Sequence, residues 1–593
     1  MPETRMKKMM LGAIPMMAVM LCLFAAGCTK KYYKESADKQ VADILSKKSQ
    51  EALGSAEKYE IEQLARDPLA DLPRATAQPL EVPENLKRAQ EPPLIISFKK
   101  ALEVAFYNSR DYQSQKEGVY LTALALTEQR HQFSAQFSGT ISSLWNSGPG
   151  EENWDTSTNF GVSKLLADGA QIGINLSSDF LHNLTGDPSR TAASILAVQI
   201  IQPLWRGAGR AVVTENLTQS ERNVIYSVRS FARYERTFTV SIASSYYRVL
   251  QQRDVVRNQQ SNYQNLIVAR ERTESLAEAG RLPEFQVDQA RQNELSAKND
   301  WIDAIQQYYE ALDNLKIDLG LPTDANVDLD NVDLEALMQA GIQHPAMSAE
   351  DAIVLALKNR LDLKNSGDQV ADAGRKIKVA ENGLGGDVNL VFNSNTPSAS
   401  NNRFLKFNGE ETNWSGGVDV NLPLDRLAER NTYRSSLISF GRAVRDYSLE
   451  IDNVKLSVRT DWRTLQQAKE SYEIQKNSVE LAKRRVESTT LLLQAGRAET
   501  RDLLDAQSSL VNAQNALTAA LINHLIARLQ FFRDIETLTV DEKGVWHEEA
   551  TNAEPAQTGP ANAEPVNVQP TKAEPANTAK PASTEAKDEP EHK

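Results

Sequence analysis

A repeat of apolar positions every seven residues runs through the second half of the chain. Counting by sevens gives nine positions, all apolar: Leu437, Val444, Ile451, Val458, Leu465, Tyr472, Val479, Val486 and Leu493. A sustained heptad is typical of a left-handed coiled-coil seam. A helix over 434–494 is roughly 90 Å long at a rise of about 1.5 Å per residue. Because a compact globule cannot contain such a helix, the pattern predicts a rod or part of a barrel wall.

A weaker copy of this heptad lies in the first half of the chain, at an offset of 216. Val228, Ile242, Val249, Val256, Tyr263 and Ala277 keep the apolar register, whereas Glu221, Glu235 and Arg270 break it. Other segments match too: Ala279-Gly280-Arg281 corresponds to Ala495-Gly496-Arg497 at the same offset, and 101–111 corresponds to 352–362 at an offset of 251. The body is therefore one structural unit written twice. We place the units at 97–320 and 348–540, with a linker at 321–347.

A different pattern, alternation of apolar and polar residues, precedes each long helix. It is found at 134–146, 157–166, 171–180, 193–202, 387–394 and 413–422. Alternation predicts strands, and about ten residues suits a tilted strand that crosses an outer membrane. Four of the seven tryptophans lie in or beside these segments, where interfacial aromatic girdles would fall: Trp145, Trp154, Trp205 and Trp414. We expect a tight turn at 167–170 and long polar loops at 147–156 and 181–191. The alternative is a water-soluble sandwich with tryptophans in its core.

The two ends of the chain predict targeting and tethering. Residues 1–27 form a signal peptide, with basic residues followed by an apolar run, and Ala25-Ala26-Gly27-Cys28 resembles a bacterial lipobox in which Cys28 is acylated. Cys22 follows Leu21, which is too large for a cleavage site. The alternative is a signal anchor with an incidental cysteine. We expect 28–96 to tether the anchor to the body, and 541–593, rich in Ala, Glu and Pro, to be a disordered tail.

Composition removes several classes of function. The net charge of −13 disfavours nucleic-acid binding, and a mean hydropathy of −0.46 disfavours a polytopic helical membrane protein. Both cysteines lie in the first 28 residues and the six histidines are scattered, so no disulfide framework or metal site is expected. No motif for a catalytic residue or a cofactor occurs, and an enzyme is the least favoured class.

The turns and their neighbours carry the candidate functional residues. Gly280 and Gly496 stand where a long helix must reverse, because glycine adopts the left-handed conformation that ends a helix. We expect Pro283 in the first turn of the returning helix. Asp502 and Asp505 are three residues apart and share a helix face. The simpler alternatives are turn chemistry alone for the glycines and a solvated acidic face for the aspartates.

These features together resemble the TolC-like outer-membrane efflux protein family, over roughly residues 95–540. The most specific segments are Gln202-Pro203-Leu204-Trp205-Arg206-Gly207-Ala208-Gly209-Arg210, Ala279-Gly280-Arg281 and 495–506. The resemblance implies a mainly α-helical fold with a membrane β-barrel part: a homotrimer whose strands close a barrel and whose helices continue it as a periplasmic tunnel. It also implies an outer-membrane location, with Thr29 after the acylated Cys28 favouring sorting there.

The resemblance assigns roles to the turns and aspartates. Ala279, Gly280, Arg281, Ala495, Gly496 and Arg497 would meet a periplasmic adaptor, which connects to an inner-membrane pump of RND or ABC type. Asp502 and Asp505 would face the lumen and form the channel constriction. The chain departs from the family at two places, Leu493 and Ala498, where a family example has a tyrosine and a latch arginine. Arg497 and Arg501 are the candidates to replace that arginine.

A second departure concerns the strands. The family pattern has two strands in each half, whereas 159–180 reads as an extra hairpin in the first half. A trimer has 18 strands if this hairpin joins the sheet, which is the arrangement we favour, and 12 if it lies outside the bilayer. We therefore predict the outer-membrane channel of a tripartite efflux or secretion system. The rival is a non-conducting coiled-coil lipoprotein of the cell envelope.

Overall fold

The computed structural model describes residues 29–56, 59, 61, 69, 72–75, 80–86, 91–149, 151–183, 190–399, 405–541 and 544–548. The predicted signal peptide at 1–27, the acylation site Cys28 and the part of the predicted tail from 549 onwards lie outside the described residues. The start of the tail, predicted to be disordered from 541, is instead ordered, because Trp546–Glu548 pair as a strand with Leu538–Val540.

A six-stranded antiparallel sheet forms one end of the body. Its order is β2-β3-β4-β5-β7-β8. The strands are β2 (Gln136–Gly148), β3 (Glu151–Leu165), β4 (Gln171–Asn183), β5 (Arg190–Pro203), β7 (Asp387–Pro397) and β8 (Asn413–Asn421). All six predicted strand segments are confirmed, and the extra hairpin, now β3 and β4, joins the sheet between β2 and β5.

The connections between strands agree with the prediction at the end of the sheet next to the helices and differ from it at the opposite end. The tight turn between β3 and β4 is confirmed. The long polar loop predicted at 147–156 is wrong, because β2 continues to Gly148 and β3 already begins at Glu151. The reason is that 151–156 continue the alternation, with Trp154 directly opposite Trp145 and Thr156 opposite Ser143. The loop predicted at 181–191 is also shorter than expected, since β4 extends to Asn183 and β5 begins at Arg190.

The helices repeat with the offsets seen in the sequence. An offset of 251 carries both ends of α3 (Phe98–Asn108) and α4 (Arg110–His131) onto those of α9 (Ala349–Asn359) and α10 (Leu361–Asn382). An offset of 216 carries α7 (Glu284–Asp318) onto α12 (Thr500–Asp534). The same offset carries the C-terminal end of α6 (Glu215–Glu278) onto that of α11 (Leu427–Gln494). The two long helices have 64 and 68 residues, which confirms the repeat and the long helices.

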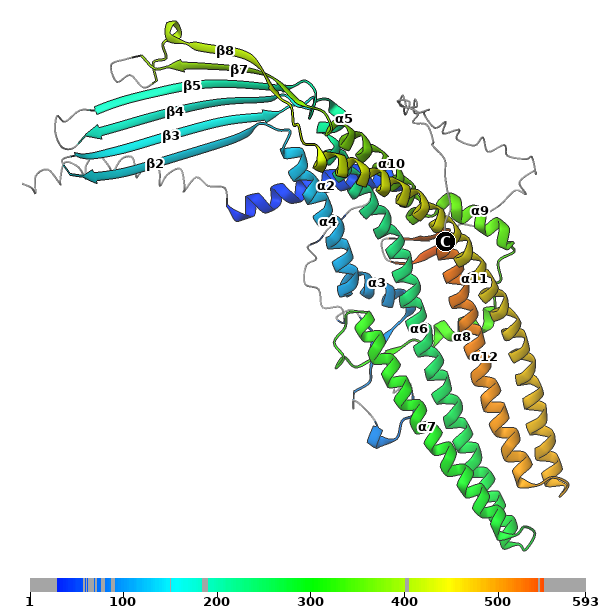
Figure 1. The fold of residues 1–593 in the computed structure, drawn as a ribbon. Coiled ribbons are helices and arrows are strands. Elements are labelled where there is room, and N and C mark those ends of the chain that lie inside the picture. Colours follow the sequence, from blue (N-terminus) through cyan, green and yellow to red (C-terminus); the bar gives the residue numbers. More distant parts are fainter. Residues whose placement is uncertain are drawn as a thin grey trace, which may run out of the picture. The chain divides into compact units, whose positions relative to one another are not determined.

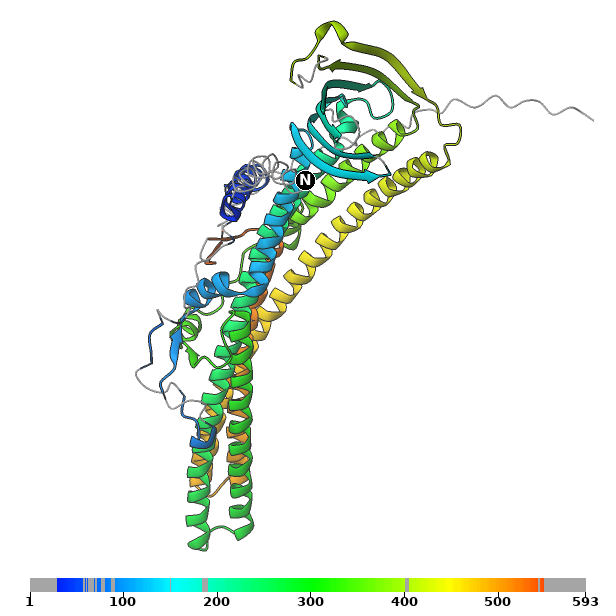
Figure 2. The same cartoon turned by 90° about the vertical axis from the view of Figure 1, so that its left-hand side faces the viewer.

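The helices form a layer next to the sheet and two hairpins away from it (Figures 1 and 2). In the layer α4 packs on α6, α6 on α10, and α10 on α11. Farther from the sheet, α6 pairs with α7, α11 pairs with α12, and α12 packs against α6. No helix in the described ranges combines the length and apolar character that a membrane-spanning helix requires.

The heptad positions of the two long helices are buried to different extents. In α6, Val228, Ile242, Val249 and Val256 are each at most 1% exposed. In α11, Val458 and Leu465 are buried but Val444, nearer the sheet, is 40% exposed. Val444 is therefore left exposed within the single chain, whereas its heptad neighbours Leu437 and Ile451 are half-buried.

The smaller elements surround the helical layer. The predicted tether contains a docked helix, α2 (Lys30–Leu53), which buries Val41, Ile44 and Leu45 where it packs against α4 and α6. The remaining elements are η1 (Glu84–Leu86), β1 (Leu94–Ile96), α5 (Arg210–Val213), β6 (Val327–Leu329), α8 (Val332–Ala340), η2 (Gly409–Glu411), β9 (Leu538–Val540) and β10 (Trp546–Glu548). Strands β1 and β6 pair in parallel, and β9 pairs with β10.

Candidate channel, constriction and docking sites

The six-stranded sheet has one apolar face. Phe137, Val162, Ile174 and Val198 lie opposite one another across four neighbouring strands, and Phe160, Leu176 and Leu196 form the next row. Many of these side chains are exposed in the single chain, including Phe137 at 80% and Phe160 at 51%. The same face carries Ile200 on β5, and Leu390, Phe392, Val418 and Val420 on the remaining strands β7 and β8. A continuous exposed apolar face of this kind matches the lipid-facing surface of an outer-membrane barrel.

Hydroxyl groups on this face are paired with one another. Ser178 and Ser194 are buried and directly opposite, with 2.6 Å between their Oγ atoms. Ser143 and Thr156 form a second pair, with 2.8 Å between Oγ and Oγ1. A hydroxyl pair of this kind can lie in an apolar environment, because each hydroxyl provides the hydrogen bond that its partner would otherwise make to water.

Tryptophans mark the two ends of the apolar face. Trp145 and Trp154 are cross-strand partners near the far ends of β2 and β3. Trp205 follows β5 at the helical end, where its carbonyl oxygen accepts a hydrogen bond from Asn382. This placement agrees with the two interfacial girdles predicted from the sequence.

The opposite face of the sheet is polar and acidic. It carries Asn153, Asp155, Asn159, Asn175, Asp179, Gln199, Asn389, Asn393, Asp419 and Asn421. Strand β5 is its most apolar strand, with Ile195 47% exposed. Within the described strands, no Lys or Arg occupies a position on this face. A surface with carboxylates and amides suits the wall of a water-filled channel that favours cations.

Both edges of this sheet are open in the single chain. β2 and β8 are the terminal strands in the order of the sheet. At these edges Phe137 and Trp414 are 80% and 75% exposed. Unpaired backbone groups are not tolerated in lipid, so a membrane-embedded sheet of this kind must be completed by another chain.

The two Ala-Gly-Arg turns have the same geometry. At the end of α6, Arg281 N–H donates to Leu276 O at 2.9 Å and Gly280 N–H donates to Ala277 O at 2.8 Å. At the end of α11, Arg497 N–H donates to Leu492 O at 2.8 Å and Gly496 N–H to Leu493 O at 3.1 Å. The glycines have φ of 71° and 69°. Both turns are therefore Schellman motifs with glycine at the left-handed position.

The turns lie side by side at the end of the hairpins away from the sheet (Figures 1 and 2). All six residues of the two turns, Ala279, Gly280, Arg281, Ala495, Gly496 and Arg497, are exposed. Pro283 is extended and immediately precedes α7, one residue before the first turn in which the sequence predicts it. The reason is that an extended residue is needed to reverse the chain before the returning helix begins.

Asp502 and Asp505 have separate local partners. Asp502 completes a capping box with Glu499, whose backbone N–H donates to Asp502 Oδ2 at 3.1 Å. Asp505 lies 3.8 Å from Arg501, measured from Oδ2 to Nε, in an exposed i, i+4 ion pair. Both carboxylates are exposed at the start of α12, close to the tip. Arg501 is therefore the candidate latch arginine that contacts one of the predicted constriction residues.

A buried charge network, which sequence reasoning missed, joins the two repeats. Arg233 of α6 contacts Asp362 of α10 at 3.2 Å and Glu536, just beyond α12, at 2.8 Å. Beside it, burial raises the pKa of Asp461 to about 7, and a hydrogen bond to Asp534 adds to the increase. Burial works against ionisation of Asp534 as well, but Arg533 at 2.8 Å holds its pKa below the ordinary value. Lone charges scattered over four segments give no sequence motif that could have revealed this network.

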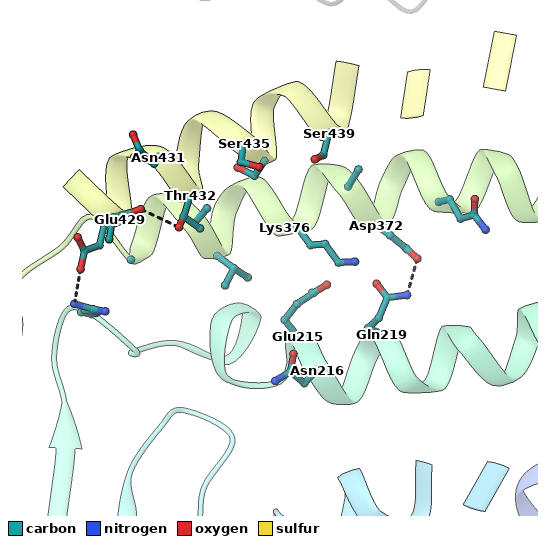
Figure 3. Close-up of a pocket in the computed structure, with 18 of the residues that line it drawn as sticks. Glu215, Asn216, Gln219, Asp372, Lys376, Glu429, Asn431, Thr432, Ser435 and Ser439 are labelled. Atoms are coloured by element: carbon teal, nitrogen blue, oxygen red, sulfur yellow. Dashed lines mark hydrogen bonds and ion pairs between the residues drawn. The ribbon is translucent and has the colours of Figure 1, made fainter. Parts of the chain in front are cut away.

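A cleft of about 1300 Å³ separates the start of α11 from α6 and α10. Figure 3 shows Asn431, Thr432, Ser435 and Ser439 of α11 across from Glu215, Asp372 and Lys376. Arg375 links the two acids, 2.9 Å from Glu215 and 2.8 Å from Asp372. Burial alone would raise the pKa of Asp372, but hydrogen bonds from Tyr226, Gln219 and Arg375 lower it. The charges are thus used to hold α6 against α10, which is a structural role.

Residues 352–533 match the family model described as outer membrane efflux protein. This part of the chain, which is most of the second repeat, therefore resembles the TolC-like outer-membrane efflux proteins in sequence. Solved structures agree in fold. CusC, described for transmembrane channel formation, has a TM-score of 0.56 at 15% identity over 78% of this chain and 99% of its own. The CmeC outer membrane channel of Campylobacter jejuni has a TM-score of 0.55 at 13% identity over 78% of this chain and 94% of its own.

The MtrE outer membrane channel of Neisseria gonorrhoeae, solved in its open state, has a TM-score of 0.53 at 13% identity. The match covers 74% of this chain and 88% of MtrE. No curated protein matches the sequence. The family and the solved relatives are outer-membrane channels rather than enzymes, and the chain shares the fold of these channels, long helical hairpins combined with a β-sheet.

Proposed function

We propose that this protein forms the outer-membrane duct of a tripartite efflux or secretion system and conducts its cargo passively from periplasm to exterior. The observation that carries the proposal is the two-faced sheet, apolar on one side and acidic on the other, which continues directly into the layer of long helices. The apolar face would contact lipid and the polar face would line the lumen.

Three copies complete the duct in this proposal. β2 of one copy would pair with β8 of the next, and the exposed part of the α11 seam around Val444 would pack on α4 of a neighbour. The pairing removes every open edge, which a bilayer demands. The resulting protein has an outer-membrane barrel and a long periplasmic tunnel.

The tips would perform two tasks in the periplasm. The exposed turns, with Arg281 and Arg497 at their ends, would dock the adaptor that brings the inner-membrane pump, of RND or ABC type. Asp502 and Asp505 from three copies would supply six carboxylates around the entrance, a constriction that attracts cations. The inner-membrane pump would supply the energy for transport. The duct would conduct passively and would need no cofactor.

Cys28 would carry the lipid that anchors each copy. It stands two residues before α2, whose first residue is Lys30. Several acyl chains on one residue give firm membrane attachment, where a single chain gives marginal binding. A Cys28→Ser variant should lose its acyl groups in a lipid-labelling experiment, while the strands keep their own membrane affinity.

Planar-bilayer recording of the purified full-length protein tests the duct. We expect discrete conductance steps from a trimeric preparation. A deletion strain should become sensitive to toxic compounds or lose a secreted product, and the wild-type gene should restore it. Trimers that never conduct, together with a deletion that changes neither tolerance nor secretion, would support the rival coiled-coil spacer instead.

A further inference from the structure

We propose that the β3–β4 hairpin is a full part of the membrane wall, so that three copies close an 18-stranded barrel with an outlet wider than the family's usual 12-stranded one. The inference rests on the proposed trimer. It deepens that function by giving the width of the outlet, which would not restrict any solute that the helical tunnel admits.

The length and pairing of the hairpin favour this placement. β3 has 15 residues and β4 has 13. β3 pairs with β2 over the whole of β2, and β4 pairs with β3 over its own full length, without a gap in either register. A tilted membrane strand needs about 9–11 residues, so both strands are long enough to cross the bilayer. A surface hairpin has no need for pairing over this length on both sides.

The apolar face of the hairpin continues that of its neighbours. Phe160 of β3 is 51% exposed and Ile174 of β4 is 43% exposed. Ile174 lies opposite Val162 on one side and Val198 on the other, in the same apolar row as Phe137 of β2. If the hairpin lay outside the bilayer, its apolar side chains would face water in the middle of a row whose other members face lipid.

The periplasmic end of the hairpin is fixed to the segment that leads into α6. Gly209 N–H donates to Asp168 O at 3.1 Å, which ties the β3–β4 turn to the chain just after β5. Gly169, at the centre of this turn, has φ of 101°, and a Cβ there would come within 2.7 Å of Gly207 O. The hairpin therefore starts at the level where β5 ends, as a wall strand must.

The extra hairpin adds strands to the barrel but adds no helices to the tunnel that continues it. Each chain contributes four helices to the layer next to the sheet, namely α4, α6, α10 and α11, so a trimer has the helices for a 12-helix tunnel. Barrel diameter grows roughly linearly with strand number, which makes an 18-stranded barrel about 1.5-fold wider than a 12-stranded one. The limiting aperture then lies in the helical part or at its tips, and the outlet passes whatever those admit.

A distance measurement across the trimer tests the proposal without depending on whether the tip is open. Gln199 lies on the polar face of β5 and its side chain is exposed. A spin label at Gln199→Cys in the full-length trimer reports the distance between equivalent positions in three copies. For strands about 4.8 Å apart and tilted by about 40°, this backbone separation is roughly 30 Å with 18 strands and roughly 20 Å with 12.

A hairpin deletion provides the matched comparison. Removing 151–183 joins β2 to β5 through the residues that now flank the hairpin, and the label at 199 should then report the shorter, 12-strand separation. The longer separation in the intact chain supports the proposal even if the deletion variant does not fold. The shorter separation in an intact trimer overturns the proposal and leaves the duct untouched. Absence of any trimer refutes the assembly on which both rest.

A labelling experiment locates the hairpin by a second route. In proteoliposomes, a spin label at Leu176→Cys, on the apolar face, should be accessible to oxygen dissolved in lipid and protected from a water-soluble nickel relaxation reagent. A label at Asn175→Cys, one residue away on the polar face, should show the reverse through the lumen. Equal access of the nickel reagent to both positions would place the hairpin outside the bilayer and contradict the proposal.

Discussion

Thr500 and Gln286 connect the two helical hairpins near their tips: Thr500 Oγ1 donates a hydrogen bond to Gln286 Oε1 across 3.3 Å. Thr500 is the first residue of α12 and is 1% exposed, whereas Gln286 lies in the first turn of α7. The two repeats thus share a bond at the end where the proposed entrance opens. If the angle between the two hairpins changes, either both residues move together or the hydrogen bond between them breaks.

Replacing Thr500 by valine should therefore loosen the tip. The side-chain volume is kept and the hydrogen bond is lost, which typically lowers stability by about 0.5–1.5 kcal/mol. Denaturant unfolding of the purified protein should show the loss, and Thr500→Ser, which keeps the hydroxyl, should recover most of it. If Thr500→Ser were destabilised as much as Thr500→Val, keeping the hydroxyl would not protect the protein, and the hydrogen bond would not be the cause of the loss.

Gly280→Ala and Gly496→Ala should each destabilise the protein by about 1 kcal/mol, because an alanine Cβ disfavours the left-handed conformation. Nothing lies within 4 Å of a Cβ at either position, so backbone strain is the sole cause we expect. Gly118 is the matched control: a Cβ added there also meets open space, but the residue lies inside α4 with no positive φ. Gly118→Ala should stabilise by about 0.5–1 kcal/mol in the same unfolding assay. Loss of stability in all three variants would argue against the conformational explanation.

The sequence is most informative where the fold depends on periodic patterns. The heptad through Val458 and Leu465 and the alternation around Phe160 are local, so they predict the long helices and every strand of the large sheet. Internal repetition indicates the helix boundaries, since offsets of 251 and 216 carry the elements of one unit onto the other.

What the sequence does not provide depends on contacts between distant segments. Arg233 meets Asp362 and Glu536 only after α6, α10 and the end of α12 are packed together. The prolines that follow α2 dominate the local composition and predict a tether, whereas the burial of α2 depends on a groove formed by α4 and α6. Asp502 illustrates a third limit: its spacing from Asp505 suggests a shared role, but its capping bond depends on the backbone of Glu499.

The carboxyl pair of Asp461 and Asp534 should make stability depend on pH. The pKa of Asp461 is raised to about 7 in the folded chain from an ordinary value of 3.8. The folded state then binds the proton more tightly than the unfolded state, so the contribution of Asp461 to stability is greatest below pH 3.8 and is lost as pH rises toward 7. Asp461→Asn should remove this dependence and stabilise the protein at pH 8 by about 1 kcal/mol, allowing for solvent screening of the partly exposed group. An unchanged pH profile in the variant would contradict the assignment.

His524 should act in the opposite direction over an overlapping range. Burial, together with His344 and nearby cations, lowers its pKa from 6.5 to about 4. The unfolded chain therefore takes up a proton that the folded chain refuses, and stability is lost as pH falls from about 6.5 toward 4. In an Asp461→Asn background, thermal unfolding scans should show this loss without the opposing carboxyl, together with a loss of the same sign from the neighbouring His344, whose pKa burial also lowers. His524→Gln in that background should flatten the profile between pH 6.5 and 4, and a profile that still falls as steeply would assign the loss to another group.

Charge on the polar face of the sheet should set the ion preference of the barrel. Asp155, Asp179 and Asp419 alternate onto this face, so three copies would place nine carboxylates along the lumen. Replacing all three by asparagine keeps the shape and removes the charge, which should shift the reversal potential in a salt gradient toward equal permeability for cations and anions. The paired variant Asp502→Asn with Asp505→Asn tests the tip in the same way. A larger shift from the strand variant would assign selectivity to the barrel, whereas a shift confined to the tip variant would contradict a role for the barrel carboxylates.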